Sequence, residues 1–65
     1  MTVTVNDQAV EVEKGTTVAA LLHRLGLPDK GVAVALNAAV LPRSQWHRPV
    51  PDGAVVDVVT AVQGG

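Results

Sequence analysis

The chain has 65 residues, no cysteine and a formal net charge of -1. One small domain of this size argues against a large enzyme cleft, and without cysteine it has neither disulfides nor a thiolate nucleophile. The near-neutral charge gives no footprint for a nucleic-acid backbone or an anionic membrane, so we expect neither as a partner.

The N-terminal segment is predicted to be a β-hairpin. Apolar and polar residues alternate over residues 2–5 and 10–13, which is typical of half-buried strands. Asn6 and Asp7 lie between the two runs and tolerate turn conformations. The two strands should therefore pair antiparallel, with one face in water.

A short amphipathic helix is expected next. After Gly15 the apolar spacing becomes i, i+3, i+4, i+7, which is one helical stripe. The stripe consists of Val18, Leu21, Leu22 and Leu25. Thr16 or Thr17 is the expected N-cap, and Gly26 followed by Pro28 ends the helix at about Leu25.

The third strand is expected at residues 32–36, where alanines alternate with larger aliphatics, and this pattern suggests close packing on both sides. Residues 42–51 contain three prolines and are predicted to form a loop around Trp46, with at most one helical turn or a short edge strand. We interpret Leu41 and Trp46 as a cover over one end of the core.

Asp52 and Gly53 form a turn signal before the last strand, residues 54–59. Its valine content places it in the middle of the sheet. The element order predicts an α+β, ubiquitin-like fold, in which a mixed sheet of four to five strands carries one main helix on one face. The connection from the second to the third strand should be a right-handed crossover if these strands run parallel. We expect a single domain, residues 1–65, with a flexible C-terminal tail at about 61–65.

The chain lacks the signals that direct proteins out of the cytoplasm. The N-terminal segment has neither the basic region nor the uninterrupted apolar region of a secretory signal. The most apolar stretch, residues 32–41, is interrupted by Asn37 and is shorter than the roughly 18 residues of a membrane span. We expect a cytoplasmic protein.

The residue types that usually carry catalysis are isolated. His23 and His47 have no partner at metal-ligand spacing, so we expect no metal site. Glu11 and Glu13 are expected on the solvent-exposed face of the hairpin, where they increase solubility and are not expected to act as a catalytic acid and base. No hydroxyl residue stands in a nucleophile elbow or beside an evident base. We therefore predict no catalytic residue and no enzyme activity.

Gly64 and Gly65 are different from the other glycines because they bound no predicted element. A frayed end is the plain alternative, but two final glycines arise by chance in only about 0.5% of chains. A backbone without Cβ atoms can pass through a narrow active-site channel, and the five residues after Thr60 can extend roughly 17 Å. An ionised carboxylate is a poor electrophile, so the end of the chain would require activation by a partner.

Several short motifs stand in a characteristic order: Asn6-Asp7-Gln8, Gly15-Thr16-Thr17-Val18, Ala35-Leu36-Asn37, Leu41-Pro42-Arg43 with Trp46, Asp52-Gly53 and Gly64-Gly65. In this order the chain resembles, over nearly its whole length, the sulfur carrier proteins of thiamin biosynthesis, which are small β-grasp proteins.

The resemblance implies a carrier cycle that ends in the thiazole ring of thiamin. An E1-like adenylating enzyme would use ATP and Mg²⁺ to adenylate the carboxylate of Gly65. A sulfur donor, such as a cysteine desulfurase or a similar persulfide source, would replace AMP and leave a thiocarboxylate for thiazole synthase. Gly64 would give slender access, and Val62 and Gln63 would be gripped by partners, while the carrier itself binds no cofactor.

The last strand also offers a possible partner surface. On its alternation, Val56 and Val58 point to the core, while Val55, Asp57 and Val59 point away from it. The family usually has larger side chains at positions 57 and 59, so this surface departs from the family pattern.

Three other functions remain compatible with the sequence. One is a sulfur carrier for molybdopterin synthesis, whose relatives are usually longer. Another is a ubiquitin-like modifier that is joined through Gly65 to lysines of target proteins. The third is a non-covalent β-grasp binding module, for which Gly64 and Gly65 would be dispensable.

Overall fold

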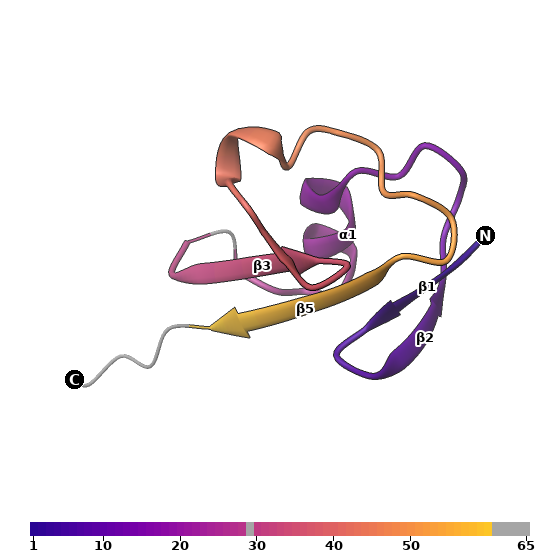
Figure 1. Ribbon diagram of the computed structural model, residues 1–65, viewed down its shortest axis with the longest axis horizontal. Helices are drawn as coiled ribbons and strands as arrows, with labels where there is room; N and C mark the ends of the chain where they lie inside the picture. The colour runs from indigo at the N-terminus through magenta and orange to yellow at the C-terminus, as the bar shows by residue number, and fades with distance from the viewer. Residues whose placement is uncertain (29, 61–65) are drawn as a thin grey trace.

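The computed structural model describes residues 1–28 and 30–60. Within these residues the chain forms five strands, one α-helix and one 3-10 helix, η1 (Figure 1). Their bounds are β1 Thr2–Val5, β2 Gln8–Glu11, α1 Val18–Arg24, β3 Val32–Leu36, β4 Ala39–Leu41, η1 Arg43–Gln45 and β5 Val55–Thr60. This arrangement confirms the predicted α+β fold.

The strands form one mixed sheet in the order β2-β1-β5-β3-β4. β1 and β5 run parallel, and the other neighbouring pairs run antiparallel. The prediction that the last strand lies in the middle is confirmed. β2 and β3 are separated by β1 and β5, so the segment containing α1 crosses the sheet between them, and the handedness of this crossover stays a prediction.

The first hairpin forms as predicted, but its second strand begins earlier than expected. Asn6 and Asp7 both have positive φ, 48° and 68°, which is the geometry of a two-residue type I′ turn. This tight turn pairs Val5 directly with Gln8, so β2 covers residues 8–11 and not 10–13. The turn sets the register, and the apolar alternation alone did not reveal where pairing starts.

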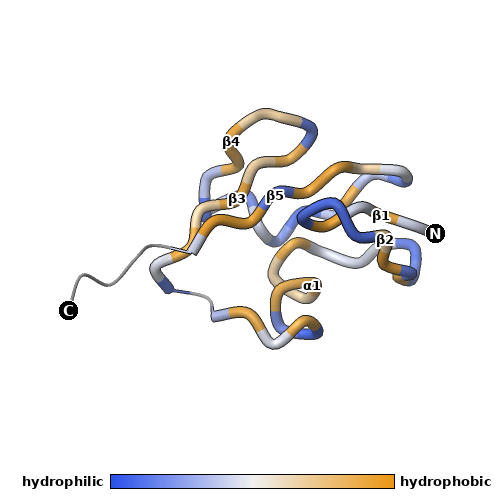
Figure 2. Tube along the Cα trace, turned by 90° about the horizontal axis from the view of Figure 1, so that it is seen from below, coloured by the Kyte–Doolittle hydropathy of each residue, from blue (hydrophilic) through white to orange (hydrophobic). Residues whose placement is uncertain are grey.

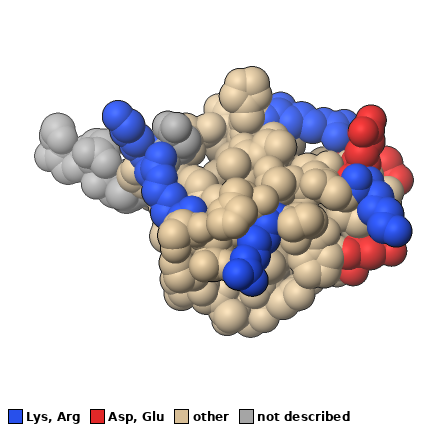
Figure 3. All heavy atoms as spheres, turned by 90° about the horizontal axis from the view of Figure 1, so that it is seen from above, with Lys and Arg blue, Asp and Glu red and all other residues tan. Residues whose placement is uncertain are grey.

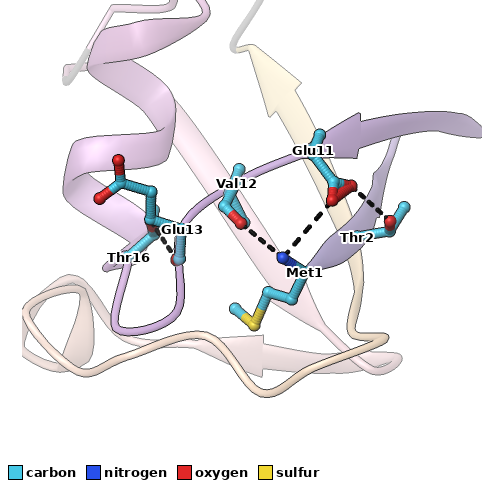
Figure 4. Close-up of polar contacts among 6 residues, drawn as sticks. All are labelled: Met1, Thr2, Glu11, Val12, Glu13 and Thr16. Atoms are coloured by element: carbon cyan, nitrogen blue, oxygen red, sulfur yellow. Dashed lines mark hydrogen bonds and ion pairs between the residues drawn. The ribbon is translucent and has the colours of Figure 1, made fainter.

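Charged and polar groups close the free end of this hairpin (Figure 4). The amino group of Met1 donates a 2.8 Å hydrogen bond to the carbonyl of Val12 and lies 3.5 Å from the carboxylate of Glu11. The hydroxyl of Thr2 donates to the same carboxylate at 2.7 Å. This hydrogen bond, together with the positive amino group, lowers the pKa of Glu11. Glu11 therefore has a structural role at the sheet edge.

Helix α1 begins where the sequence predicted. The side chain of Thr17 is the N-cap and accepts a 3.1 Å hydrogen bond from the N–H of Ala20. Three of the four stripe positions are buried against the sheet: Val18, Leu21 and Leu22. The helix thus packs on one face of the sheet as expected.

The end of α1 differs from the prediction in one respect. Gly26 has φ 72° and donates its N–H to the carbonyl of His23, while the N–H of Leu27 reaches Leu22, which is the Schellman arrangement. Leu25 is then the cap residue and is 38% exposed, so it does not complete the buried stripe. Leu27 packs against the core in its place.

β3 continues into a short strand, β4, that was not predicted. Asn37 and Ala38 have φ 51° and 69° and form a second tight hairpin turn. The prediction that β3 is packed closely on both sides is wrong. Val34 is buried on the helix side, but Ala33 is exposed, because α1 covers only one face of the sheet.

The connection from β4 to β5 carries Trp46 into the core, where it is 6% exposed. Its indole N–H donates to the carbonyl of Leu41 at 3.2 Å, and the guanidinium of Arg43 lies 5.3 Å from the ring centroid. The carbonyl of Trp46 accepts the N–H of Ala19 in α1 at 3.1 Å. Trp46 thus has the predicted structural role, and η1 is the one helical turn that the prolines permit.

The core lies between β5, its neighbouring strands and α1. Figure 2 shows apolar segments on the sheet and on the helix beneath it. Val56 and Val58 point inward, as the alternation predicted. The buried hydrophobic residues are Val3, Val5, Val12, Val18, Leu21, Leu22, Val34, Trp46, Val50, Ala54, Val56 and Val58.

Candidate functional site: strand β5 and the face beside it

β5 is the element that leads to the predicted site of modification. It lies between β1 and β3, and it is the last element of the described chain (Figure 1). The expected tail residues, Val62, Gln63, Gly64 and Gly65, lie outside the described residues. The structure therefore defines the strand and the surface from which this segment continues.

The outward side chains of β5 lie where the alternation placed them. Val55 is 43% exposed, Val59 is 65% exposed, and Asp57 between them is also exposed. Ala33 and Ala35 of β3 stand opposite Val59 and Asp57, so they share this face of the sheet. The outer face beside the end of β5 is thus largely apolar.

Val40 is part of the same face and was missed by sequence reasoning. It pairs with Ala35 in the β3–β4 hairpin, and its side chain is 80% exposed. The signal was present in the apolar run of residues 32–41, but the strand containing Val40 had not been predicted. Next to this region Gly31, Val32, Ala33 and Val59 line a shallow hollow of about 290 Å³. We call these exposed residues, Ala33, Val40, Val55, Asp57 and Val59, the outer patch.

Two asparagine side chains hold β5 from opposite sides. Asn6, in the turn after β1, accepts the N–H of Val58 at 2.8 Å and donates to its carbonyl at 3.2 Å. Asn37, in the turn after β3, accepts the N–H of Val55 at 2.9 Å. The sequence indicated the turn at Asn6, but it did not indicate that the side chains of Asn6 and Asn37 contact β5.

The charges are distributed unevenly on the face seen in Figure 3. Acidic side chains gather at the end where Figure 1 places the N-terminus, and Lys and Arg side chains are spread more widely. At this end Lys14 and Asp52 line a hollow together with Met1. Among the five residues that define the outer patch, Asp57 alone is charged.

The described residues contain no cluster of metal-binding side chains. Within residues 1–28 and 30–60, no three His, Asp or Glu side chains gather closely enough to hold a metal ion. His23 lines a hollow with Trp46 near the end of α1, and His47 is exposed on the following loop. No helix in the described part of the chain is long and apolar enough to cross a membrane.

Comparison with known proteins identifies relatives that span the chain. The sequence pattern of the ThiS family matches residues 2–65. A sulfur carrier protein ThiS of Escherichia coli is 36% identical over 66 residues, which covers 100% of both chains. A sulfur carrier protein ThiS of Thermus thermophilus is 45% identical over 53 residues, covering 80% of this chain and 83% of the relative.

Solved structures agree with the sequence comparison. The crystal structure of a thiamine biosynthesis protein (ThiS) from Geobacter metallireducens matches with a TM-score of 0.81 and 32% identity over 100% of both chains. The solution structure of a thiamine biosynthesis protein from the same organism matches with a TM-score of 0.77 and 32% identity, covering all of this chain and 88% of that one. With its fold and nearly its whole sequence matched, the chain belongs to the ThiS family.

Proposed function

We propose that this chain is a sulfur carrier of thiamin biosynthesis, which carries sulfur as a thiocarboxylate on Gly65. The observation that supports this most strongly is the family match, which runs along the chain to Gly65 and includes two relatives named as sulfur carriers. The chain is then a co-substrate of partner enzymes and does not itself catalyse the reaction.

The chemistry begins with a carboxylate that cannot react unaided. In the proposed cycle an oxygen of the Gly65 carboxylate attacks the α-phosphorus of ATP, and pyrophosphate leaves. A persulfide donor then displaces AMP from the acyl carbon, and a thiol cleaves the resulting acyl disulfide to release the thiocarboxylate. Thiazole synthase takes sulfur from this group. ATP and Mg²⁺ are bound by the E1-like adenylating partner.

This chain contributes strand β5, which is held in the sheet, and the backbone from Thr60 to Gly65 that follows it. β5 pairs with β3 from Val56 to Thr60 and with β1 at Val55 and Val56, and it packs Val56 and Val58 into the core. From Thr60 the chain can extend roughly 17 Å to Gly65, which is enough to place a carboxylate inside a partner while the domain stays outside. Gly64 would allow close approach of the partner, and Val62 and Gln63 would be held by it.

We further propose that the outer patch docks the partner enzymes. Val55 and Val59 present apolar surface on the same strand that carries the reactive end, so docking there would place the tail near the partner's active site. Asp57 would give this surface one charge for orientation. The hollow beside Val59 has room for a small apolar side chain of the partner.

The test is the intact mass of the protein after incubation with its cognate adenylating enzyme, ATP, Mg²⁺, a persulfide source and a thiol. We expect a mass change that corresponds to one oxygen replaced by sulfur, located on Gly65 by fragmentation. A chain without Gly65 and the variant Gly64→Val are the controls, and both should stay unmodified while remaining folded. An unmodified wild-type chain, under conditions where a known carrier reacts, would contradict the proposal. Attachment to lysines of other proteins would instead indicate a modifier.

A further inference from the structure

One exposed turn residue, Asn6, makes three hydrogen bonds to strand β5. Its backbone N–H donates to the carbonyl of Val56 at 3.0 Å. Its side-chain oxygen accepts the N–H of Val58 at 2.8 Å, and its side-chain nitrogen donates to the carbonyl of Val58 at 3.2 Å. The side-chain amide thus satisfies both backbone groups of a residue that lies 52 positions later in the sequence.

These bonds continue a ladder that the backbone of β1 can no longer supply. Along the parallel pair, the N–H of Thr4 donates to Ala54 and the N–H of Asn6 donates to Val56. The next rung would pair Val58 with the following peptide group of β1. At Asn6, however, φ is 48° and the chain turns away toward β2. The side-chain amide takes the place of that missing peptide group.

The two edges of β5 are therefore held by different means near the strand's end. On the β3 edge, strand pairing continues from Val56 opposite Leu36 to Thr60 opposite Val32. On the β1 edge, strand pairing covers Val55 and Val56, and Asn6 supplies the contact at Val58. Removing the Asn6 amide would leave the final residues of β5 supported from one side only.

We infer that Asn6 is a positioning residue for the reaction at the end of the chain. By fixing both edges of β5 up to Val58, it sets the direction in which the chain leaves the domain. A partner that docks the domain then receives the following residues with less orientational freedom to remove. This inference rests on the proposed carrier function and adds a residue to it that makes no contact with ATP or sulfur.

The test compares two glycine variants, Asn6→Gly and Asn37→Gly. Both positions have φ near 50°, which glycine adopts freely, so each variant keeps its turn and loses only a side-chain contact with β5. Asn37 contacts Val55, at the start of β5, and so serves as the matched control. Adenylation is followed as ATP–pyrophosphate exchange with the cognate adenylating enzyme, and amide hydrogen exchange is measured at Val58.

We expect Asn6→Gly to raise the KM for the carrier about tenfold with kcat little changed, since the cost is in orienting the tail and not in the chemistry. Val58 should exchange its amide hydrogen faster in this variant, whereas Asn37→Gly should leave both quantities near wild type. Asn6→Asp keeps the acceptor for the N–H of Val58 but loses the donor to its carbonyl, so it should lie between wild type and Asn6→Gly. If Asn6→Gly does not fold, Asn6→Asp is used in its place to test the positioning role.

Equal kinetic constants for Asn6→Gly and Asn37→Gly, in an assay where the wild type reacts, would overturn the positioning role. Unchanged exchange at Val58 in Asn6→Gly would overturn it as well, because the strand would then be held without the amide. If the wild-type chain is not adenylated at all, the carrier function itself fails. This failure can be told apart from failure of the positioning role, because it is seen with the wild-type chain and needs no variant.

Discussion

Two asparagines, Asn6 and Asn37, each hold a tight turn and a distant strand at the same time. Both adopt positive φ as the first residue of a two-residue hairpin turn, a conformation that asparagine tolerates better than most residues. Because the turns point the side chains toward β5, the same residues bond to Val58 and Val55. A single residue type therefore satisfies a local and a long-range requirement.

The second residue of the β3–β4 turn, Ala38, is less suited to its position. Its φ is 69°, where a Cβ atom costs about 1–2 kcal/mol. Ala38→Gly should remove this strain, while the greater freedom of glycine in the unfolded chain takes back about 0.5–1 kcal/mol. We expect a net increase of about 0.5–1 kcal/mol in the free energy of unfolding, measured by urea denaturation with an unchanged slope. The neighbouring variant Ala39→Gly, in β4, should lose stability, and a loss in Ala38→Gly as well would contradict this account.

Sequence reasoning succeeded for residues whose role is local. A cap at Thr16 or Thr17 and the turn at Asn6-Asp7 follow from neighbouring residues; the structure confirms the turn and selects Thr17 as the cap. The bonds from Asn6 to Val58 could not be predicted, since they depend on the register of two strands that are brought together only in the folded sheet. Periodicity carries no information about such a pairing.

Among the elements, α1 makes the clearest contribution to stability. Its seven residues are too few to form a stable helix alone, so it depends on burying its apolar stripe against the sheet. Leu21 is fully buried, with 0% exposure, and lies at the centre of this contact. The helix and the sheet face beneath it should therefore fold as one unit.

Truncating this stripe tests that dependence. Leu21→Ala should lower the free energy of unfolding by about 2–5 kcal/mol, because it removes buried methyl groups and leaves a cavity. Leu25→Ala is the matched control: it makes the same chemical change at the end of the helix, where the side chain is 38% exposed, and should cost clearly less. Urea denaturation of both variants gives the comparison. Similar losses in the free energy of unfolding for the two variants would contradict the expectation that Leu21, being more deeply buried, contributes more to stability than Leu25.

The elements that sequence reasoning misplaced are those whose limits are set by a turn. β2 begins at Gln8 because the two-residue turn pairs it at once with Val5, and β4 exists because Asn37 and Ala38 reverse the chain immediately after β3. β4 has only three residues, too few for a clear alternation. In contrast, the helix and β5 carry strong patterns, and both were predicted to within a residue or so.

At the scale of the whole molecule, the two faces of the sheet have different roles. One face packs against α1 and forms the core, while the other presents the outer patch. The valine-rich β5 serves both faces through its alternation, with Val56 and Val58 inward and Val55 and Val59 outward. The sequence predicted this division for β5. It did not predict Val40, because that contribution required the β3–β4 pairing.

This separation predicts that docking can be impaired without unfolding the domain. Val59→Glu places a charge on a side chain that is 65% exposed, so we expect it to cost at most about 1 kcal/mol of stability. If the outer patch docks the adenylating enzyme, the added charge must be desolvated at the interface, and the Kd should rise at least about tenfold.

Ala9→Glu is the control, since it adds the same charge to the same face of the sheet. Ala9 lies on the edge strand β2, where it pairs with Thr4, so that β1 separates it from the outer patch. Calorimetric titration of both variants into the enzyme should show weaker binding for Val59→Glu and near wild-type binding for Ala9→Glu. Equal weakening would indicate that net charge, and not this patch, governs association. Undiminished binding of Val59→Glu would contradict this docking surface. The adenylating enzyme would then bind a different face of the domain and receive the chain after β5 from there.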